Sequence, residues 1–390
     1  MHAIELFAGA GGLGIGVSRA GFKTQHVIER DRYCCDTLRE NKARELAPIK
    51  DWPLFEGDIR EFDFRRFEGR LALVSGGPPC QPFSVGGKHR AYNDARDMFP
   101  EAVRAVRQSQ PRAFIFENVK GLTRSTFANY YECLYLQMSY PELERRVDED
   151  WNDHLIRLER HHTGKRRDRG LEYRVVRRVL NAANYGVAQK RERVFFVGFR
   201  ADLGIEWHFP EDTHALDPLV WEQCRTGEYW ERHKVSKQQR VTPSAFKQRV
   251  NRLDGKPEKR AWRTVRDAIG DLPDPRRHPL LARMHLNHAF QPGARTYPGH
   301  TGSPVDEPAK TLKAGVHGVP GGENMMVSPD GSVRYFTVRE SARLQTFPDE
   351  FVFHGSWTET MRQLGNAVPV SLARVVASGV REQLRGTYRD

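Results

Sequence analysis

The segment 76–84 contains the chain's best candidate for a nucleophile. It reads Gly-Gly-Pro-Pro-Cys-Gln-Pro-Phe-Ser, and its cysteine is Cys80. The apolar run 71–74 before it is typical of a buried parallel strand, and open α/β sheets carry reactive groups at the carboxyl ends of such strands. Because Pro78 and Pro79 fix φ and lack N–H donors, the loop has little freedom. A thiol presented in this way indicates a nucleophile, although a cysteine buried beside a Gly/Pro turn fits the same residues.

Two further segments would bring a carboxyl group and two guanidinium groups to the same sheet edge. Glu117 follows the apolar run 113–116, so we expect it to leave the sheet beside Cys80. Arg191 and Arg193 alternate with a glutamate, and both point to one face if their segment is a strand. A capping or salt-bridging glutamate and a surface ion pair are the alternatives that these residue types leave open.

The first strand-like segment ends in a glycine-rich turn that predicts a cofactor pocket. Residues 4–14 read Ile-Glu-Leu-Phe-Ala-Gly-Ala-Gly-Gly-Leu-Gly, and a helical pattern follows through about Arg19. Glycines let the backbone approach a cofactor. Glu29 and Asp58 follow later strand-like segments, where carboxylates commonly accept hydrogen bonds from ribose hydroxyls. The Gly-x-Gly-x-x-Gly spacing is absent in its usual register, as is a phosphate-binding lysine. The turn therefore suits an adenosine without a pyrophosphate, although nicotinamide and flavin enzymes also use such turns.

Six segments together resemble the motifs of the DNA (cytosine-5)-methyltransferase family, in the family's order and over nearly the full chain. They are the glycine-rich opening, the loop around Cys80, the triplet Glu117-Asn118-Val119, and the segments 189–193, 339–349 and 363–369. The resemblance implies an α/β fold with a doubly wound, mostly parallel sheet of the S-adenosylmethionine-dependent methyltransferase type. It also implies a second, smaller DNA target-recognition domain.

The same resemblance implies a reaction and a role for each polar residue. A methyl group from S-adenosylmethionine would pass to C5 of a cytosine flipped out of duplex DNA, leaving S-adenosylhomocysteine. Cys80 would add to C6 as a thiolate and make C5 nucleophilic, while Glu117 would neutralise the charge that develops at N3. Arg193 would contact the ring, and Arg191 would support the loop. Such a site-specific enzyme would protect DNA from a cognate restriction endonuclease.

The resemblance assigns eleven residues to the cofactor pocket. They are Phe7, Gly9, Gly11, Gly12, Leu13, Glu29, Asp58, Ile59, Pro78, Asn366 and Ala367. No metal is expected, because the five cysteines have no metal-ligand spacing.

The length of 390 residues predicts two lobes. We expect a catalytic and cofactor-binding domain over 1–200, and a target-recognition domain over 201–345 with its core at about 272–335. The segment 346–390 would return to the catalytic domain. The highly charged segment 141–170 is longer than compact family members need. We expect a solvated helical pair there, with a DNA-touching arm as the alternative.

The balance of charges indicates an anionic partner. The formal net charge is +12, the isoelectric point is about 9.6, and the segment 231–263 holds eleven Lys and Arg against three Asp and Glu. Basic tracts supply salt-dependent phosphate contacts, so double-stranded DNA is the expected partner; a solvated linker is the alternative for this tract. No apolar run approaches the ~20 residues that a membrane span needs. We expect a bacterial, cytoplasmic and nucleoid-associated monomer with no obligate protein partner.

Three other functions share parts of this pattern. A transfer-RNA cytosine methyltransferase would carry the same catalytic residues. An inert relative would act only as a binding protein, and the presence of Cys80, Glu117 and Arg193 argues against it. A nicotinamide oxidoreductase is suggested by the glycine-rich turn alone.

Overall fold

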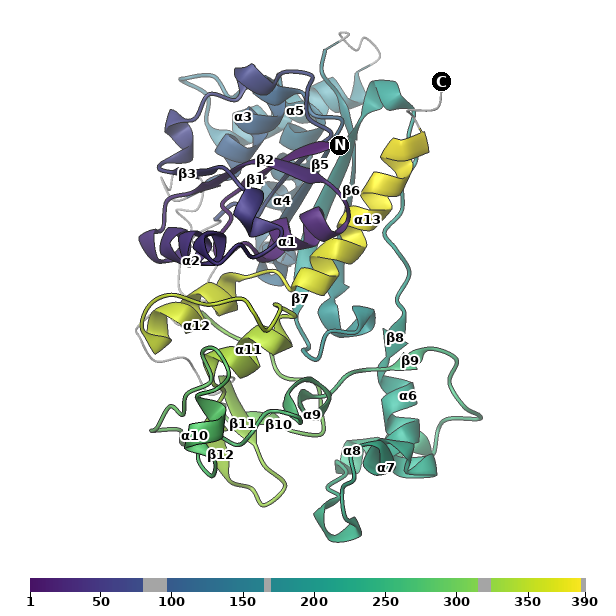
Figure 1. The fold of residues 1–390 in the computed structure, drawn as a ribbon. Coiled ribbons are helices and arrows are strands. Elements are labelled where there is room, and N and C mark those ends of the chain that lie inside the picture. The colour runs from purple at the N-terminus through teal and green to yellow at the C-terminus, as the bar shows by residue number, and fades with distance from the viewer. Residues whose placement is uncertain (80–96, 165–169, 315–323, 387–390) are drawn as a thin grey trace.

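A seven-stranded sheet with the order β3-β2-β1-β4-β5-β7-β6 forms the centre of the larger lobe (Figure 1). The computed structural model describes residues 1–79, 97–164, 170–314 and 324–386. The strands are β1 (His2–Leu6), β2 (Lys23–Glu29), β3 (Leu54–Glu56), β4 (Leu73–Gly76), β5 (Ala113–Val119), β6 (Tyr173–Asn181) and β7 (Glu192–Arg200). The first five pair in parallel, and β7 runs antiparallel to both β5 and β6. The predicted α/β fold with a mostly parallel sheet is confirmed.

The two central strands lie where the apolar runs predicted them. All four residues of β4 and the first six of β5 are buried, as expected for strands that are covered on both faces. The carboxyl ends of β4 and β5 are neighbours in the sheet, with Gly76 paired with Phe116. This pairing places the residues that follow Gly76 next to Glu117.

Helices cover both faces of the sheet (Figure 1). The helices of this lobe are α1 (Gly12–Arg19), α2 (Arg32–Ala43), α3 (Phe99–Ser109), α4 (Ala128–Ser139), α5 (Trp151–Thr163) and α13 (Val370–Gly386). The predicted helices at 12–19 and about 370–384 are α1 and α13, and they share one hydrophobic core. A Cβ on Gly16 would lie 2.4 Å from the Cβ of Ala373, so only a glycine lets the two helices approach this closely.

The charged segment 141–170 is a correction to the sequence analysis, because its described part contains one helix and not a pair. Residues 141–150 form turns, and α5 follows. The carboxylate of Glu142 accepts a hydrogen bond from the backbone N–H of Leu171, which favours a turn over a helix there. The helix is also not fully solvated, since Leu155 and Leu158 pack against α4.

The smaller lobe lies below the central sheet in the view of Figure 1. Its described apolar side chains form two separate hydrophobic clusters. We call residues 214–262 the helical module. It comprises β8 (His214–Ala215), α6 (Leu216–Trp221), a π-helical turn (Glu222–Thr226), α7 (Glu228–Arg232), α8 (Ser244–Val250) and β9 (Arg260–Ala261). The remainder comprises α9 (Val265–Ile269), α10 (Pro279–Ala282), β10 (Ser303–Pro304), β11 (Met325–Val327), β12 (Val333–Tyr335) and α11 (Val338–Leu344). The helix α12 (Trp357–Asn366) packs against β2, α1 and α2 of the larger lobe. Within the described ranges, no helix is both long and apolar enough to cross a membrane.

Candidate active site

Glu117 and Arg193 form a buried ion pair at the end of the sheet. Glu117 comes from β5 and Arg193 from the adjacent strand β7, and Arg193 Nε lies 2.9 Å from Glu117 Oε1. The Glu117 side chain is only 7% exposed. Burial raises the pKa of Glu117, and the positive charges of Arg193 and Arg191 oppose that rise. A carboxyl group with a raised pKa can carry a proton nearer to neutral pH than an ordinary glutamate does.

The loop that leads to Cys80 begins beside this ion pair. Cys80 itself lies outside the described residues. A Cβ on Gly77 would lie 3.3 Å from Glu117 Oε2, so the backbone passes directly over the carboxylate. Asn118 Nδ2 donates a hydrogen bond of 2.9 Å to the carbonyl of Pro78. The residue after Glu117 therefore fixes the start of the Pro-Cys loop, an interaction that the sequence analysis missed although it named the triplet.

Arg191 is a buried connector between distant segments. Its Nη2 donates to the carbonyls of Gly365 and Ala367 at 2.7 and 2.8 Å, and its Nη1 donates to the carbonyl of Leu312 at 3.1 Å. The side chain is fully buried, and burial lowers its pKa. Arg191 therefore ties the edge of the sheet to the smaller lobe and to the segment that contains Asn366.

A cavity of about 700 Å³ opens beside the ion pair. Glu117 and Arg193 line it together with all but one of the residues assigned to the cofactor. Those residues are Phe7, Gly9, Gly12, Leu13, Glu29, Asp58, Ile59, Pro78, Asn366 and Ala367. One cavity thus contains both the residues expected to act on the cytosine and the residues expected to bind the cofactor.

Gly11 is the exception, because it is not among the residues that line the cavity. It has a φ of 85°, caps the N-terminus of α1, and faces Trp52, whose ring would lie 3.0 Å from a Cβ at this position. Gly11 therefore lets the backbone adopt the left-handed conformation that begins α1, and it does not line the cavity. The turn is strained nearby as well: Phe7 has a φ of 54°, which is uncommon for a bulky residue and is found at functional sites.

Two glycines of the glycine-rich turn, Gly9 and Gly12, shape the cavity in different ways. Gly9 has a φ of 55°, and a Cβ there would meet nothing within 4 Å, so the turn is open at this point. A Cβ on Gly12 would lie only 2.5 Å from the carbonyl of Val368. The beginning of α1 and the segment after α12 therefore form adjoining walls of the cavity.

Glu29 and Asp58, the two carboxylates expected to accept hydrogen bonds from ribose hydroxyls, have different environments. Glu29 accepts hydrogen bonds from the backbone N–H groups of Gly9, Arg30 and Asp31 at 2.7, 2.8 and 2.7 Å. Burial nevertheless raises its pKa. Asp58 binds Arg60 through two oxygens, and this interaction lowers the pKa of Asp58 to about 2. Glu29 thus shapes the glycine-rich turn, while Asp58 remains ionised at the cavity wall.

The sequence analysis missed a polar bridge between two walls of the cavity. Arg362 Nη2, on α12, lies 2.9 Å from Asp31 Oδ2, at the N-terminus of α2. Both residues line the cavity. Asp31 follows Glu29 closely and precedes a helical pattern, which was a signal for a capping residue; nothing in the sequence indicated Arg362 as its partner. In the described part of the chain, no cluster of three or more His, Cys, Asp or Glu could hold a metal ion.

A family model and two similar curated relatives all identify methyltransferases. The model of the C-5 cytosine-specific DNA methylase family matches residues 1–139 and 167–382, and leaves 140–166 unmatched. Type II methyltransferase M.PspPI of Psychrobacter sp. (strain TA137) is 30% identical over 99% of this chain and 80% of its own length. Type II methyltransferase M.Eco47II of Escherichia coli is 31% identical over 97% of this chain and 78% of its own length.

Solved structures share the fold at lower sequence identity. A putative DNA modification methyltransferase encoded within an E. coli prophage superposes with a TM-score of 0.57 at 19% identity, over 99% of both chains. The Dnmt2 methyltransferase of S. pombe superposes with a TM-score of 0.55 at 16% identity, also over 99% of both chains.

Proposed function

Because the chain belongs to the C-5 cytosine-specific DNA methylase family, we propose that it transfers a methyl group from S-adenosylmethionine to C5 of a flipped-out cytosine in double-stranded DNA. The observation that carries this proposal is the single cavity of about 700 Å³ that the Glu117–Arg193 pair shares with the glycine-rich turn. A cavity of this size lies within the range of small-molecule sites. We further propose that the methylation is site-specific and protects DNA from a cognate restriction endonuclease, as the Type II names of the relatives suggest.

The cavity suits the proposed cofactor by its shape and its donor set. The open turn at Gly9 leaves room for a ligand against the backbone, and Phe7 and Ile59 offer apolar surface. Glu29 and Asp58 supply acceptors for hydroxyl and amino groups, and Asn366 and Ala367 form the opposite wall. When bound, S-adenosylmethionine would supply an electrophilic methyl group.

The polar residues of the chain would prepare the cytosine for that electrophile. The Cys80 thiolate would form a bond to C6, the electron pair of the C5–C6 double bond would form a C4–C5 double bond, and the electron pair of the C4–N3 double bond would move to N3. After C5 takes the methyl group, loss of the C5 proton to water and expulsion of the Cys80 thiolate from C6 would restore the ring. Glu117, protonated, would donate to N3, and its raised pKa supports that role. Arg193, whose Nε lies 2.9 Å from Glu117 Oε1, would contact the ring through its guanidinium group. Arg191 would keep the loops of the two lobes in place through its three hydrogen bonds to carbonyl groups.

The description of the family model names DNA, and this favours DNA over a transfer-RNA substrate. We further propose that the chain acts as a monomer in the bacterial cytoplasm, close to the nucleoid.

Transfer of a labelled methyl group tests the proposal. Purified protein should move label from S-adenosylmethionine into duplex DNA, and the Cys80→Ala variant should bind the cofactor but transfer no label. Transfer to RNA but not to DNA would replace the proposed substrate, and transfer by the Cys80→Ala variant would exclude the covalent step.

A further inference from the structure

A second pocket, of about 290 Å³, lies in the helical module, away from the cavity at the edge of the central sheet. It is formed by α6, by the residues that follow it, and by the segment 256–261. Its charged lining comprises Glu222, Arg232, Lys256, Lys259 and Arg260, and the rings of His214 and Trp221 also line it. The sequence analysis expected phosphate contacts from the basic segment 231–263 as a whole and singled out no individual residue of this pocket.

The charges of this pocket are not balanced. Glu222 is already bound by Arg232, whose Nη1 lies 3.0 Å from Glu222 Oε2. Lys256, Lys259 and Arg260 are exposed, and none has an ion pair with another described residue. Three cations therefore line the pocket without an ion-pair partner in the described part of the chain, and an anion would complete them.

Two neighbouring groups support the same conclusion. The Nε1–H of Trp221 is buried and has no acceptor among the described residues, and a buried donor without a partner is costly. His214 also lines the pocket; burial, followed by the positive charges of Arg260 and Arg263, lowers its pKa to about 4. The imidazole is therefore neutral at pH 7. The contribution of Arg260 and Arg263 to its lowered pKa indicates a positive electrostatic potential in the pocket.

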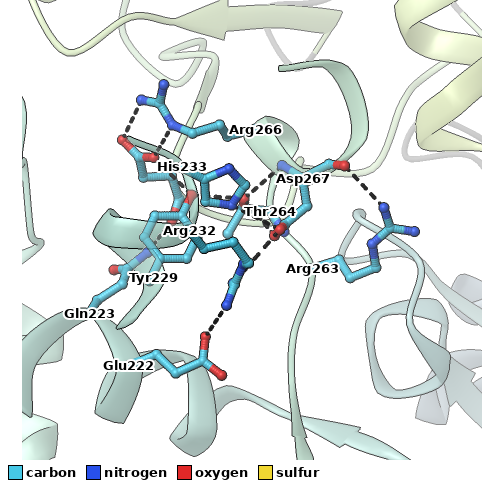
Figure 2. Close-up of polar contacts among 10 residues, drawn as sticks. Glu222, Gln223, Tyr229, Arg232, His233, Arg263, Thr264, Arg266 and Asp267 are labelled. Carbon is cyan, nitrogen blue, oxygen red and sulfur yellow. Dashed lines mark hydrogen bonds and ion pairs between the residues drawn. The ribbon is translucent and has the colours of Figure 1, made fainter. Parts of the chain in front are cut away.

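The helical module is fixed to the rest of the smaller lobe by a buried polar network (Figure 2). Asp306 accepts hydrogen bonds from Arg266 Nε at 2.6 Å and from the hydroxyl of Tyr229 at 2.8 Å, and Gln223 Nε2 donates to its carbonyl at 2.7 Å. His233 lies 2.9 Å from Asp267 in the same network. A pocket on this module therefore has a fixed position relative to the rest of the smaller lobe.

We propose that the pocket between α6 and the segment 256–261 binds a phosphodiester group of the DNA backbone. The proposal rests on the proposed DNA substrate and adds a place where that substrate is held. A backbone phosphate is favoured over a free phosphate because basic residues continue outside the pocket along the same module. Lys234, Lys237, Lys247 and Arg252 are exposed and have no ion pair with another described residue.

The test is the salt dependence of duplex DNA binding by the triple variant Lys256→Gln, Lys259→Gln and Arg260→Gln. The slope of log K against log salt should become less steep by about one for each DNA phosphate that the variant no longer binds. The matched control replaces Arg19, Lys23 and Arg174 by Gln, three exposed cations that lie away from this module and near the opposite end of the central sheet from the cavity. The control should keep the wild-type slope, and binding of S-adenosylhomocysteine should verify that both variants are folded.

A second variant, Trp221→Phe, removes the N–H donor and no charge. It should weaken DNA binding several-fold at fixed salt while the slope stays the same.

Inorganic phosphate at constant ionic strength provides the contrary test. If it stabilises the wild type but not the triple variant against heat, and the salt slope of DNA binding is unchanged in the triple variant, the pocket is a free-anion site and the proposal is overturned. An unchanged slope without such stabilisation would overturn it as well. Wild-type protein that transfers no methyl group to DNA would instead refute the proposed function, so the two failures are distinct.

Discussion

Glu117 illustrates how burial and a counter-charge act on one carboxyl group. Burial raises its pKa, and Arg193 at 2.9 Å acts in the opposite direction. The proposed step needs a group that can hold a proton before the reaction and share it with N3 as charge develops there. The ion pair keeps the carboxyl group oriented, and the dry surroundings keep its pKa above that of an exposed glutamate.

Replacement of Glu117 by Gln should slow the chemical step by about 100- to 10,000-fold, the usual contribution of general acid–base catalysis. Glutamine retains the shape and a hydrogen-bond donor, but it cannot give up a proton. Single-turnover methyl transfer is the measurement. Glu192→Gln is the control, because Glu192 is exposed and its ion pair is with Lys120. A wild-type single-turnover rate in Glu117→Gln would remove Glu117 from its proposed role.

A second buried carboxyl group, Glu5, was not singled out from the sequence. It lies in β1 at the wall of the cavity, it is 2% exposed, and its carboxylate accepts a hydrogen bond from Ser75. Burial raises the pKa of Glu5 from its ordinary value of 4.5 to about 8, and the hydrogen bond from Ser75 opposes the rise only in part. The sequence shows a glutamate in a strand, but the burial that sets its pKa depends on α1 and on the neighbouring strand β4.

The raised pKa of Glu5 predicts a pH-dependent stability. The folded state holds this proton up to about pH 8, whereas the unfolded carboxyl group loses it near pH 4.5. Unfolding therefore becomes easier as the pH rises from 4.5 to 8, and the effect is absent below that range. Relative to Glu5→Gln, the wild type should lose melting temperature between pH 5 and pH 8. Glu45→Gln, at an exposed side chain, is the control; a constant difference between wild type and Glu5→Gln across this range would contradict the assigned pKa.

At the scale of elements, the sequence predicted what depends on local pattern. The apolar runs at 71–74 and 113–116 correspond to β4 and β5, and the helical patterns correspond to α1 and α13 to within a few residues. The pairing of α1 with α13 joins residues more than 350 positions apart. It followed only from the family resemblance, which suggested that the C-terminal segment returns to the first lobe.

The part that could not be predicted consists of interactions between distant loops. Arg191 was expected to support a loop, but its acceptors, the carbonyls of Leu312, Gly365 and Ala367, are backbone groups that no side-chain pattern encodes. The described part of 141–170 contains one helix where a pair was expected. There the carboxylate of Glu142 accepts a hydrogen bond from Leu171, 29 positions away, which the local pattern does not encode. Cys80 lies outside the described residues, so its role stays a prediction.

The close packing of α1 against α13 gives a prediction at this scale. In an isolated helix, Gly→Ala stabilises by up to about 1 kcal/mol. At Gly16 the added Cβ would meet the Cβ of Ala373 at 2.4 Å and the backbone N of Arg374 at 2.7 Å. Gly16→Ala should therefore reduce the free energy of unfolding by about 1–3 kcal/mol, the usual cost of overpacking.

Denaturant unfolding measures this effect. Gly386→Ala is the matched control, because a Cβ there meets nothing within 4 Å and should be tolerated. A stabilised Gly16→Ala variant would mean that the two helices do not pack as described.

At the scale of the whole molecule, the active-site cavity and the basic segment lie in different lobes. The larger lobe supplies the cavity and the Glu117–Arg193 pair, while the basic segment 231–263 lies within and next to the helical module of the smaller lobe. The formal net charge of +12 favours a polyanionic partner. The fold and the family could be predicted from the sequence. The position of the basic segment within the smaller lobe required the structure, because it depends on the network around Asp306.

The most direct test of the central claim is bisulfite sequencing of DNA from a host without cytosine methylation that expresses this protein. Cytosines within one short repeated sequence should resist conversion in cells with the wild type, and none should resist conversion with Cys80→Ala. This result would identify the reaction and the target sequence together. Complete conversion of the DNA in cells that contain folded, cofactor-binding wild-type protein would contradict the proposed DNA methylation.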